Sequence, residues 1–228
     1  YLEKQGKTLV DEPDSLLFTH LHGDHFAGLP ALLVPICEEI NGIVGNDKRG
    51  LQRKLEITSP HQNLPNKIEE IMEQQYKGIF SSFKKQGPNL LIKQINPEGD
   101  TIQGLNIKAA QSFHSYLNYA YRFEDSLAGK SFAISGDGSL TPQTRNLFKG
   151  VDLLVHEGFS IIKSIGENHC SIKEVIDYAI LAQIPKVAIV HVNRQERKKS
   201  KRIEQLHYFA KEKGINVLLP EDHDEIIL

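Results

Sequence analysis

The sequence contains no tryptophan, one methionine and only two cysteines. Cys37 and Cys170 are too few for the disulfide frameworks of small secreted proteins, which excludes that class. The chain has no apolar run of about 18 residues and no signal-like N-terminal segment, so nothing indicates a membrane partner. The formal net charge of −2 gives no chain-wide basic surface of the kind that binds nucleic acids. We therefore expect a cytoplasmic globular protein.

The length and composition fit one large globular domain. The chain has 228 residues, of which 39% are hydrophobic and 25% are charged. A chain of this size and composition can bury a stable hydrophobic core without disulfide bonds. No stretch rich in proline, glycine or serine divides the chain as a linker would. We therefore predict a single domain over residues 1–228.

Local sequence patterns predict alternating strands and helices. Apolar runs bounded by turn residues indicate strands, and apolar residues that repeat with a period of 3.6 indicate helices. The predicted strands are Ser15 to Thr19, Leu55 to Thr58, Leu90 to Ile95, Leu105 to Ala110, Tyr119 to Glu124, Ser131 to Ser135, Asp152 to His156, Lys186 to His191 and Asn216 to Leu219. The predicted helices are Phe26 to Asn41, Lys67 to Tyr76, Pro142 to Phe148, Ser171 to Gln183 and Lys199 to Lys213, with a loop over Asn41 to Arg53. This order predicts an α/β (α+β) fold with sheets packed between helices.

The helix predicted from Ser171 has the clearest local signals. Serine caps helix N-termini, and Glu174 follows three residues later, as in a capping box. The apolar residues that follow keep the helical period, so one face is expected to pack on a sheet. These residues are Ile172, Val175, Ile176, Ala179 and Ile180.

Histidine stands out among the residue types, with ten in the chain. One apolar run, Leu16-Leu17-Phe18, is followed directly by Thr19-His20-Leu21-His22-Gly23-Asp24-His25. Alternate residues of a strand point to one face, so His20 and His22 are expected to face the same spot. Gly23 permits a sharp turn that brings Asp24 and His25 round to it. The alternative is a set of histidines satisfied by hydrogen bonds, but imidazoles packed this closely gain more from a shared cation.

The run from His20 to His25 resembles the signature of the metallo-β-lactamase fold superfamily. That resemblance implies a four-layered αββα sandwich and three further metal ligands, with candidates in the expected order at His114, Asp137 and His191. Taken singly, these residues have structural explanations as a loop histidine, a turn former and a core histidine at a strand end. The agreement of four separated motifs favours the role of ligands.

The resemblance also implies how the ligands divide between two divalent metal ions. One ion is held by His20, His22 and His114, the other by Asp24, His25 and His191, and Asp137 bridges the two. Two cations about 3.5–4 Å apart lower the pKa of a shared water towards neutrality. The ligand atoms are nitrogen and oxygen without thiolate, which suits zinc best, with manganese and iron as alternatives.

Within the superfamily, several details resemble the ribonuclease Z and phosphodiesterase branch. Asp24 supplies a carboxylate ligand, which favours two cations that clamp a phosphate. The chain also carries His156-Glu157-Gly158-Phe159, His169-Cys170-Ser171 and Tyr119-Ala120-Tyr121-Arg122, which are similar to that branch's His-Glu-Ala-Thr, His-Ser-Thr and Gly-Tyr-Arg segments.

The resemblance assigns catalytic roles to three of these residues. It makes His169 the proton donor to the leaving 3′ oxygen, oriented by its acidic partner Glu157. His156 precedes that partner in the same motif. The alternatives are a helix-start histidine at His169 and, for His156 and Glu157, a buried hydrogen-bonded pair that only supports the ligands.

The chain also departs from true ribonuclease Z. It lacks the Pro-x-Lys-x-Arg-Asn motif and the Gly/Pro-rich arm that grips transfer RNA. A basic run over Arg194 to Arg202 begins three residues after His191, and it is either a solvated face or a phosphate-binding segment. The segment Thr8 to Asp11 resembles a strand end that in relatives lies much farther from the histidine run. We therefore expect residues of the natural protein to be missing before Tyr1 and around Asp11.

These observations predict a dinuclear metal-dependent hydrolase of phosphodiesters that uses a metal-bridging hydroxide as nucleophile. The candidate substrates are small phosphodiesters, cyclic nucleotides and the 3′ end of an RNA, the last as in tRNA processing by an endonuclease. The resemblance suggests a homodimer. The first rival is an acyl hydrolase, such as a lactonase or thioesterase, on the same scaffold. The second rival is a non-catalytic metal-binding or RNA-binding protein, although open metal coordination argues against it.

Overall fold

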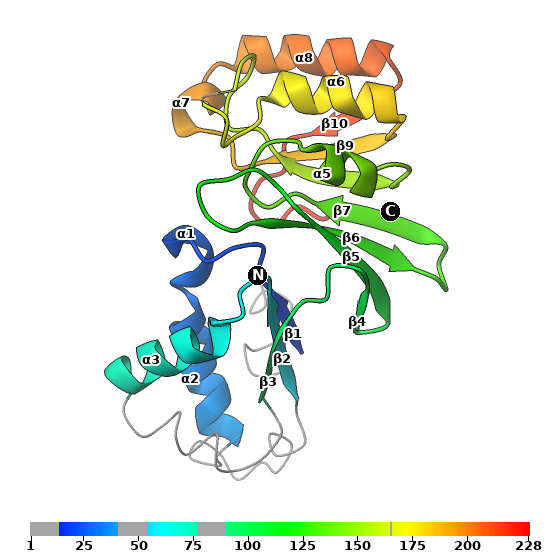
Figure 1. Cartoon of the computed structure of the whole chain (residues 1–228). Helices are drawn as coiled ribbons and strands as arrows, with labels where there is room; N and C mark the ends of the chain where they lie inside the picture. The colour runs from blue at the N-terminus through cyan, green and yellow to red at the C-terminus, as the bar shows by residue number, and fades with distance from the viewer. Residues whose placement is uncertain (1–13, 41–53, 77–89, 165) are drawn as a thin grey trace. The chain divides into compact units, whose positions relative to one another are not determined.

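The computed structural model of the protein describes residues 14–40, 54–76, 90–164 and 166–228. The chain forms two compact units, Tyr1–Ile95 and Asn96–Leu228, hereafter the N-terminal and C-terminal units. Each unit has its own β-sheet (Figure 1). Both units mix helices with strands, so the predicted α/β class is confirmed. Among the described residues, no helix is both long enough and apolar enough to cross a bilayer.

In the residues that the structure describes, the N-terminal unit contains a small parallel sheet together with helices. Its strands are β1 (Ser15–Leu17), β2 (Leu55–Ser59) and β3 (Leu90–Gln94), in the order β1-β2-β3. Its helices are α1 (Gly23–Phe26), α2 (Leu29–Ile40) and α3 (Leu64–Gln75). The loop predicted over Asn41 to Arg53 and the segment Thr8 to Asp11 lie outside the described residues.

The core of this unit is formed by β2 and by the apolar faces of its helices. On α3 the buried residues Leu64, Ile68 and Met72 are spaced four apart, so they form one face of the helix. They pack in one cluster with Leu55 and Ile57 of β2. The N-terminal unit therefore buries the chain's single methionine in its core.

The single helix predicted over Phe26 to Asn41 is wrong at its start. The chain forms α1 and then α2, with Ala27 and Gly28 between them. Pro30 explains the break, because it has no N–H to donate to the carbonyl of Phe26 and is instead tolerated in the first turn of α2.

The C-terminal unit contains a seven-stranded mixed sheet. Its strands are β4 (Asp100–Ile102), β5 (Leu105–Gln111), β6 (Tyr119–Asp125), β7 (Lys130–Ile134), β8 (Leu153–Glu157), β9 (Lys186–Val190) and β10 (Asn216–Leu218). They are arranged in the order β10-β9-β8-β7-β6-β5-β4. Strands β7 to β10 are mutually parallel, whereas β4 to β7 pair antiparallel.

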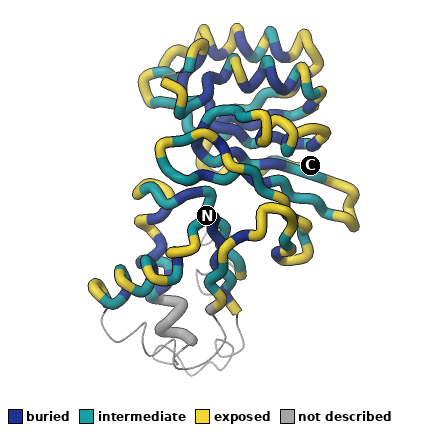
Figure 2. The backbone as a smooth tube through the Cα atoms, in the orientation of Figure 1, coloured by how far each residue is buried: buried dark blue, intermediate teal, exposed yellow. Residues whose placement is uncertain are grey.

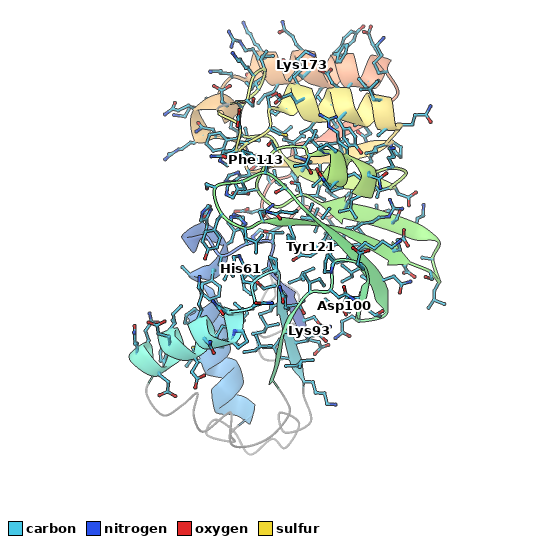
Figure 3. The ribbon with its side chains drawn as sticks, viewed as in Figure 1. His61, Lys93, Asp100, Phe113, Tyr121 and Lys173 are labelled. Carbon is cyan, nitrogen blue, oxygen red and sulfur yellow. The ribbon has the colours of Figure 1, made fainter. Side chains whose placement is uncertain are left out.

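Four described helices belong to this unit, and all but α7 contribute to the core that packs on the sheet. They are α5 (Pro142–Leu147), α6 (Ile172–Ala182), α7 (Arg194–Arg197) and α8 (Ser200–Glu212). Buried apolar residues of α6 and α8 form one cluster with β8 and β9, and Figure 2 shows these inner surfaces as the most buried part of the unit. Outward-facing residues such as Lys173 stay in solvent, where Lys173 pairs with Asp177 (Figure 3).

The capping box predicted at Ser171 is confirmed. The Ser171 Oγ accepts from the Glu174 backbone N–H at 3.2 Å, and the Glu174 carboxylate accepts from the Ser171 N–H at 2.8 Å. Both ends of this reciprocal contact satisfy N–H groups that the first turn of a helix leaves without partners. The start of α6 is thus fixed immediately after His169 and Cys170.

Two short elements were not expected from the sequence. Strand β4 has three residues and is joined to β5 through Gln103 and Gly104, whose φ angles are 50° and 81°. Two successive positive φ angles are typical of a type I′ hairpin turn, which usually contains Asn-Gly rather than Gln-Gly. Helix α7 is a single turn in the basic run, too short to produce a helical period.

The strand directions bring four chain segments to the same edge of the large sheet. Strands β7, β8 and β9 are parallel, and β5 runs in the same direction because both β5 and β7 are antiparallel to β6. The segments that follow the carboxyl ends of these strands therefore meet at one edge. They carry His114, Asp137, Glu157, His169 and His191.

Candidate metal ligands and catalytic groups

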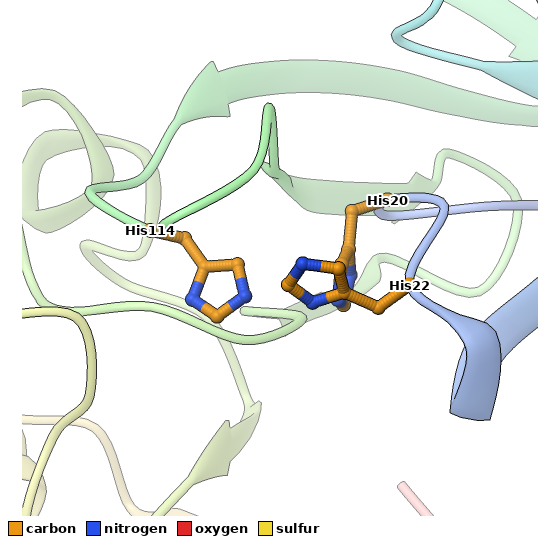
Figure 4. A group of neighbouring side chains, drawn as sticks. All are labelled: His20, His22 and His114. Atoms are coloured by element: carbon orange, nitrogen blue, oxygen red, sulfur yellow. The ribbon is translucent and has the colours of Figure 1, made fainter.

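The N-terminal unit gathers four of the predicted ligands on one turn of chain. His20 and His22 lie in the extended segment after β1, and their ring centroids are 4.8 Å apart (Figure 4). The His20 ring is 4.1 Å from that of His25, and His25 Nε2 lies 3.6 Å from Asp24 Oδ2. The predicted cluster from His20 to His25 therefore forms within this unit.

The start of α1 explains why these side chains converge. His22 is the N-cap, with extended backbone angles, and its carbonyl accepts from the N–H groups of His25 and Phe26. The chain therefore passes from strand-like to helical geometry at Gly23. Residues on the two sides of this change can point to a common spot, which neither a strand nor a helix alone would allow.

In the C-terminal unit, Asp137 follows β7 in a tightly packed turn. The flanking residues Gly136 and Gly138 have φ angles of 62° and 126°, which favour glycine. A Cβ at Gly138 would lie 2.5 Å from Ser112 Oγ, so no side chain fits there. Ser112 Oγ also donates to the Asp137 carbonyl at 3.1 Å. The Ser-Gly-Asp turn is therefore held directly against the segment that follows β5.

Glu157, at the end of β8, is the hydrogen-bonding centre of this edge. Its Oε2 accepts from His169 Nδ1 at 2.7 Å and from His191 Nδ1 at 3.1 Å. Its Oε1 accepts from the backbone N–H groups of Gly138 at 2.7 Å and Cys170 at 3.2 Å. The side chain is completely buried, and four donors offset the loss of water around the carboxylate.

These bonds set the orientation of both histidines. A carboxylate only accepts, so His169 and His191 each donate from Nδ1 and keep Nε2 for another partner. His191 Nε2 lies 3.5 Å from Asp137 Oδ2, so the two predicted ligands of this unit are neighbours. A carboxylate behind a ligating imidazole is the usual way in which a protein fixes the ring and raises its basicity.

Glu157 and the two histidines that it orients could themselves be taken for a metal site. Glu157, His169 and His191 bring one ligand atom each to within 4.8 Å of one another. The short hydrogen bonds from the two Nδ1 atoms already account for this approach. We therefore interpret Glu157 as the support of the two imidazoles rather than as a ligand.

His114 stands on the segment after β5, beside His169. The ring centroids of the two histidines are 5.2 Å apart, and His114 Nδ1 lies 3.2 Å from the carbonyl of Asn168. If Nδ1 donates to that carbonyl, the ring nitrogen that can offer a lone pair to a metal is Nε2 of His114, whose side chain is drawn in Figure 4. The neighbouring Phe113 pairs through its backbone with Ser139 and keeps its ring half exposed (Figure 3).

His156 lies apart from these groups. Neighbouring residues of a strand point to opposite faces, and the His156 ring packs edge-on against Phe148, with centroids 5.8 Å apart. Its Nδ1 is 2.8 Å from the Glu157 carbonyl. Burial lowers the pKa of His156, so the ring is neutral near pH 7. This position favours a role in packing, and the catalytic role stays a prediction.

A family comparison places these groups in context. The model of the beta-lactamase superfamily domain matches residues 3–192, which include every predicted ligand. The chain belongs to the metallo-β-lactamase superfamily. The resemblance read from the histidine run is thereby confirmed, and members of this superfamily are mostly metal-dependent hydrolases.

Solved structures agree on the superfamily fold. The metallo-β-lactamase fold protein YhfI from Bacillus subtilis is 18% identical with a TM-score of 0.65, covering 91% of this chain and 75% of that one. Human tRNase Z, short form, is 21% identical with a TM-score of 0.66, covering 97% and 81%. A diphosphatase of the PhnP family is 15% identical with a TM-score of 0.61, covering 94% and 71%. A search of curated proteins finds no significant match.

The donor atoms fit the metals of the metallo-β-lactamase superfamily. The predicted ligands offer imidazole nitrogens and carboxylate oxygens, the set that suits zinc and other first-row divalent cations. Cys170 packs in the hydrophobic core, where burial raises the pKa of its thiol to about 12. Each unit, taken by itself, contains imidazole nitrogens and carboxylate oxygens among the predicted ligands.

Two supporting residues carry little signal in the sequence. The amide Nδ2 of Asn118 donates to Ser112 Oγ at 2.6 Å and to the Ser135 carbonyl at 3.1 Å, so it ties the segment after β5 to the start of the turn that carries Asp137. The ring of Phe159 stacks on His169, with centroids 4.6 Å apart and planes 22° apart. An asparagine before a strand usually indicates a turn, and nothing in the sequence predicts that Phe159 faces His169.

Gly158 lies where neighbouring side chains leave no room for a Cβ. A Cβ at this position would lie 2.7 Å from Ile189 Cγ2 and 2.8 Å from Ile172 Cγ1. The sequence departs here from the His-Glu-Ala-Thr segment, and the two isoleucines fill the space that an alanine methyl would need. The departure is therefore a packing substitution beneath the site.

Proposed function

We propose that this protein is a dinuclear metal-dependent hydrolase of phosphodiesters. The proposed ligands are His20, His22 and His114 for one ion and Asp24, His25 and His191 for the other, with Asp137 bridging. When bound, the ions supply water activated near neutral pH and positive charge for a phosphate. The other roles fall to residues of this chain.

The observation that carries the proposal is the pair of histidines on Glu157. One carboxylate oxygen of Glu157 orients both the proposed ligand His191 and the proposed proton donor His169. A departing alkoxide needs a proton, and general acid catalysis by a positioned histidine contributes typically about 10²–10⁴-fold. His169 can supply that proton from Nε2, because its Nδ1 is already bonded to Glu157.

Phe159 and His114 limit the movement of the proposed proton donor. The Phe159 ring covers one side of the His169 ring, and the His114 ring meets it edge-on. A ring held at one edge by Glu157 and packed by two neighbours keeps few rotamers, which reduces the entropy lost on reaching the reactive geometry. His169 is thus held in one orientation, as a proton donor to a leaving group requires.

The names of two structural neighbours fit a phosphorus-containing substrate. One is a tRNase Z and another is a diphosphatase of the PhnP family, both less than 25% identical to this chain. We propose the 3′ end of an RNA as the natural substrate and zinc as the preferred metal. The carboxylate of Asp24 in the ligand set supports phosphate over acyl substrates.

A substrate panel with metal analysis tests this function. The purified chain is loaded with zinc or manganese, analysed for metal content and assayed with an aryl phosphodiester, an aryl lactone, a β-lactam and an RNA with a 3′ extension. We expect the phosphodiester to be turned over far better than the lactone, and a chelator to abolish the activity. Preferred cleavage of the lactone would favour the acyl hydrolase, and bound metal without any turnover would favour a non-catalytic protein.

A further inference from the structure

The basic segment Arg194–Arg202 is the most strongly charged stretch near the proposed site. It contains six basic residues and one acidic residue, in a chain whose net charge is −2. It spans α7 and the first turn of α8, and all six basic residues are exposed. Such a local excess of one charge in a nearly neutral chain calls for a partner of opposite charge.

The charges of the basic segment are only partly neutralised within the chain. Arg197 pairs with Glu221, and Lys199 pairs with Glu196. Within the part of the chain that the structure describes, Arg194, Lys198 and Lys201 form no ion pair. These three side chains therefore keep their charge available for an external anion.

Hydrogen bonds fix the basic segment to the loop that follows β8. This loop carries Phe159, whose ring stacks on the proposed proton donor His169. The Asn193 N–H donates to the Phe159 carbonyl at 2.9 Å, and the Asn193 side chain caps α7. The Glu196 carboxylate accepts from the Ile161 N–H at 3.3 Å. Because the Phe159 ring stacks on His169, the segment is anchored to the same loop that positions His169.

We propose that the basic segment binds the backbone phosphates of an RNA strand whose scissile bond lies at the proposed site. This inference rests on the proposed function and adds that the enzyme prefers a polymeric phosphodiester to a small one. The segment begins three residues after the proposed ligand His191, and its hydrogen bonds with Phe159 and Ile161 hold it against the loop that follows β8.

The composition of the segment favours a nucleic acid over a membrane surface. It contains no apolar residue between Arg194 and Arg202, whereas helices that bind membranes at the interface need an apolar face to insert. It also contains no aromatic residue for base stacking. Contacts are therefore expected with phosphates, independent of base sequence and sensitive to salt.

A triple variant tests the proposal by binding. Arg194→Gln, Lys198→Gln and Lys201→Gln remove three of the charges that form no ion pair, and Lys130→Gln, Lys149→Gln and Lys213→Gln remove three exposed charges elsewhere as the matched control. The probe is a fluorescent single-stranded RNA, measured by anisotropy against salt in chelator, so that no turnover occurs. For single strands each lost phosphate contact lowers the slope of log affinity against log salt by about 0.7, so we expect a loss of about 2.

A probe without phosphates and the salt slope of the triple variant test whether the segment binds backbone phosphates. A peptide nucleic acid of the same sequence has no phosphates and should not bind either protein. An unchanged salt slope in the triple variant would overturn the proposal, as would binding to anionic vesicles in place of RNA.

Turnover separates this proposal from the proposed function. We expect the triple variant to cleave a small aryl phosphodiester as well as the unaltered chain does, but to lose about tenfold or more in kcat/KM on RNA at low salt. Equal losses on both substrates would refute a role confined to the polymer. Absence of phosphodiester turnover in every protein, with the salt-dependent RNA binding intact, would remove the proposed function and leave the binding surface standing.

Discussion

The two units assemble their candidate ligands in different ways. In the N-terminal unit, His20, His22, Asp24 and His25 are neighbours in sequence, and one change from extended to helical backbone brings them together. In the C-terminal unit the groups come from four segments, and they meet only because their strands end at one edge of the sheet. The first arrangement depends on local geometry, and the second depends on the packing of the whole unit.

The largest expected effect comes from removing the proposed bridge in the C-terminal unit. Asp137→Ala should abolish turnover and reduce metal content, because both ions lose a carboxylate oxygen. His22→Ala, in the local cluster, should weaken one ion only. Activity measurements with elemental analysis check this, and unaltered turnover in Asp137→Ala would contradict the bridging role.

Removing the proposed proton donor should have the next largest effect. His169→Ala should lower turnover by about 10²–10⁴-fold while the metal stays bound, because His169 is not a proposed ligand. Glu157→Gln should lower turnover and also weaken metal binding by about 10–100-fold, because Glu157 supports the ligand His191 as well. A metal titration of both variants distinguishes the roles, and an unchanged rate in His169→Ala would remove it from the mechanism.

A packing change beneath the site tests how far its geometry depends on the core. Gly158→Ala should destabilise the protein by about 1–3 kcal/mol, because the added methyl overlaps Ile172 and Ile189. Gly99→Ala is the matched control, since nothing lies within 4 Å of the added Cβ there. Denaturant unfolding measures the free energy of unfolding of the two variants. Equal values would contradict the prediction, because they would mean that Ile172 and Ile189 move to make room for the methyl group without loss of stability.

The smallest effect concerns a pH-dependent link between β7 and β8. Asp152 accepts hydrogen bonds from the N–H and hydroxyl of Ser131, and the backbone bond lowers the pKa of its carboxyl. A lowered folded-state pKa adds stability that is complete above the unfolded value of about 3.9 and is lost as the pH falls through the folded value. Asp152→Asn should therefore be less stable at neutral pH, with the difference shrinking below about pH 3.9. A difference that grows with acid would contradict this sign.

Features that depend on local geometry could be predicted from the sequence, whereas features that depend on the packing of distant segments could not. The cluster at His20 to His25 and the capping box at Ser171 are local patterns, and both are confirmed. The predicted helix from Phe26 was wrong at its start because Pro30 cannot donate a hydrogen bond to the carbonyl of Phe26, which separates α1 from α2. The support given by Asn118 and Phe159 depends on which segments become neighbours, which no short pattern encodes.

His191 has a φ angle of 50°, in a region that costs a residue with a side chain about 1–2 kcal/mol. Glycine or asparagine at this position would adopt the same backbone angles at a lower cost in free energy. Selection for thermal stability alone would therefore replace this proposed ligand, so the residue found at position 191 can serve as a marker of whether a related chain keeps the proposed site.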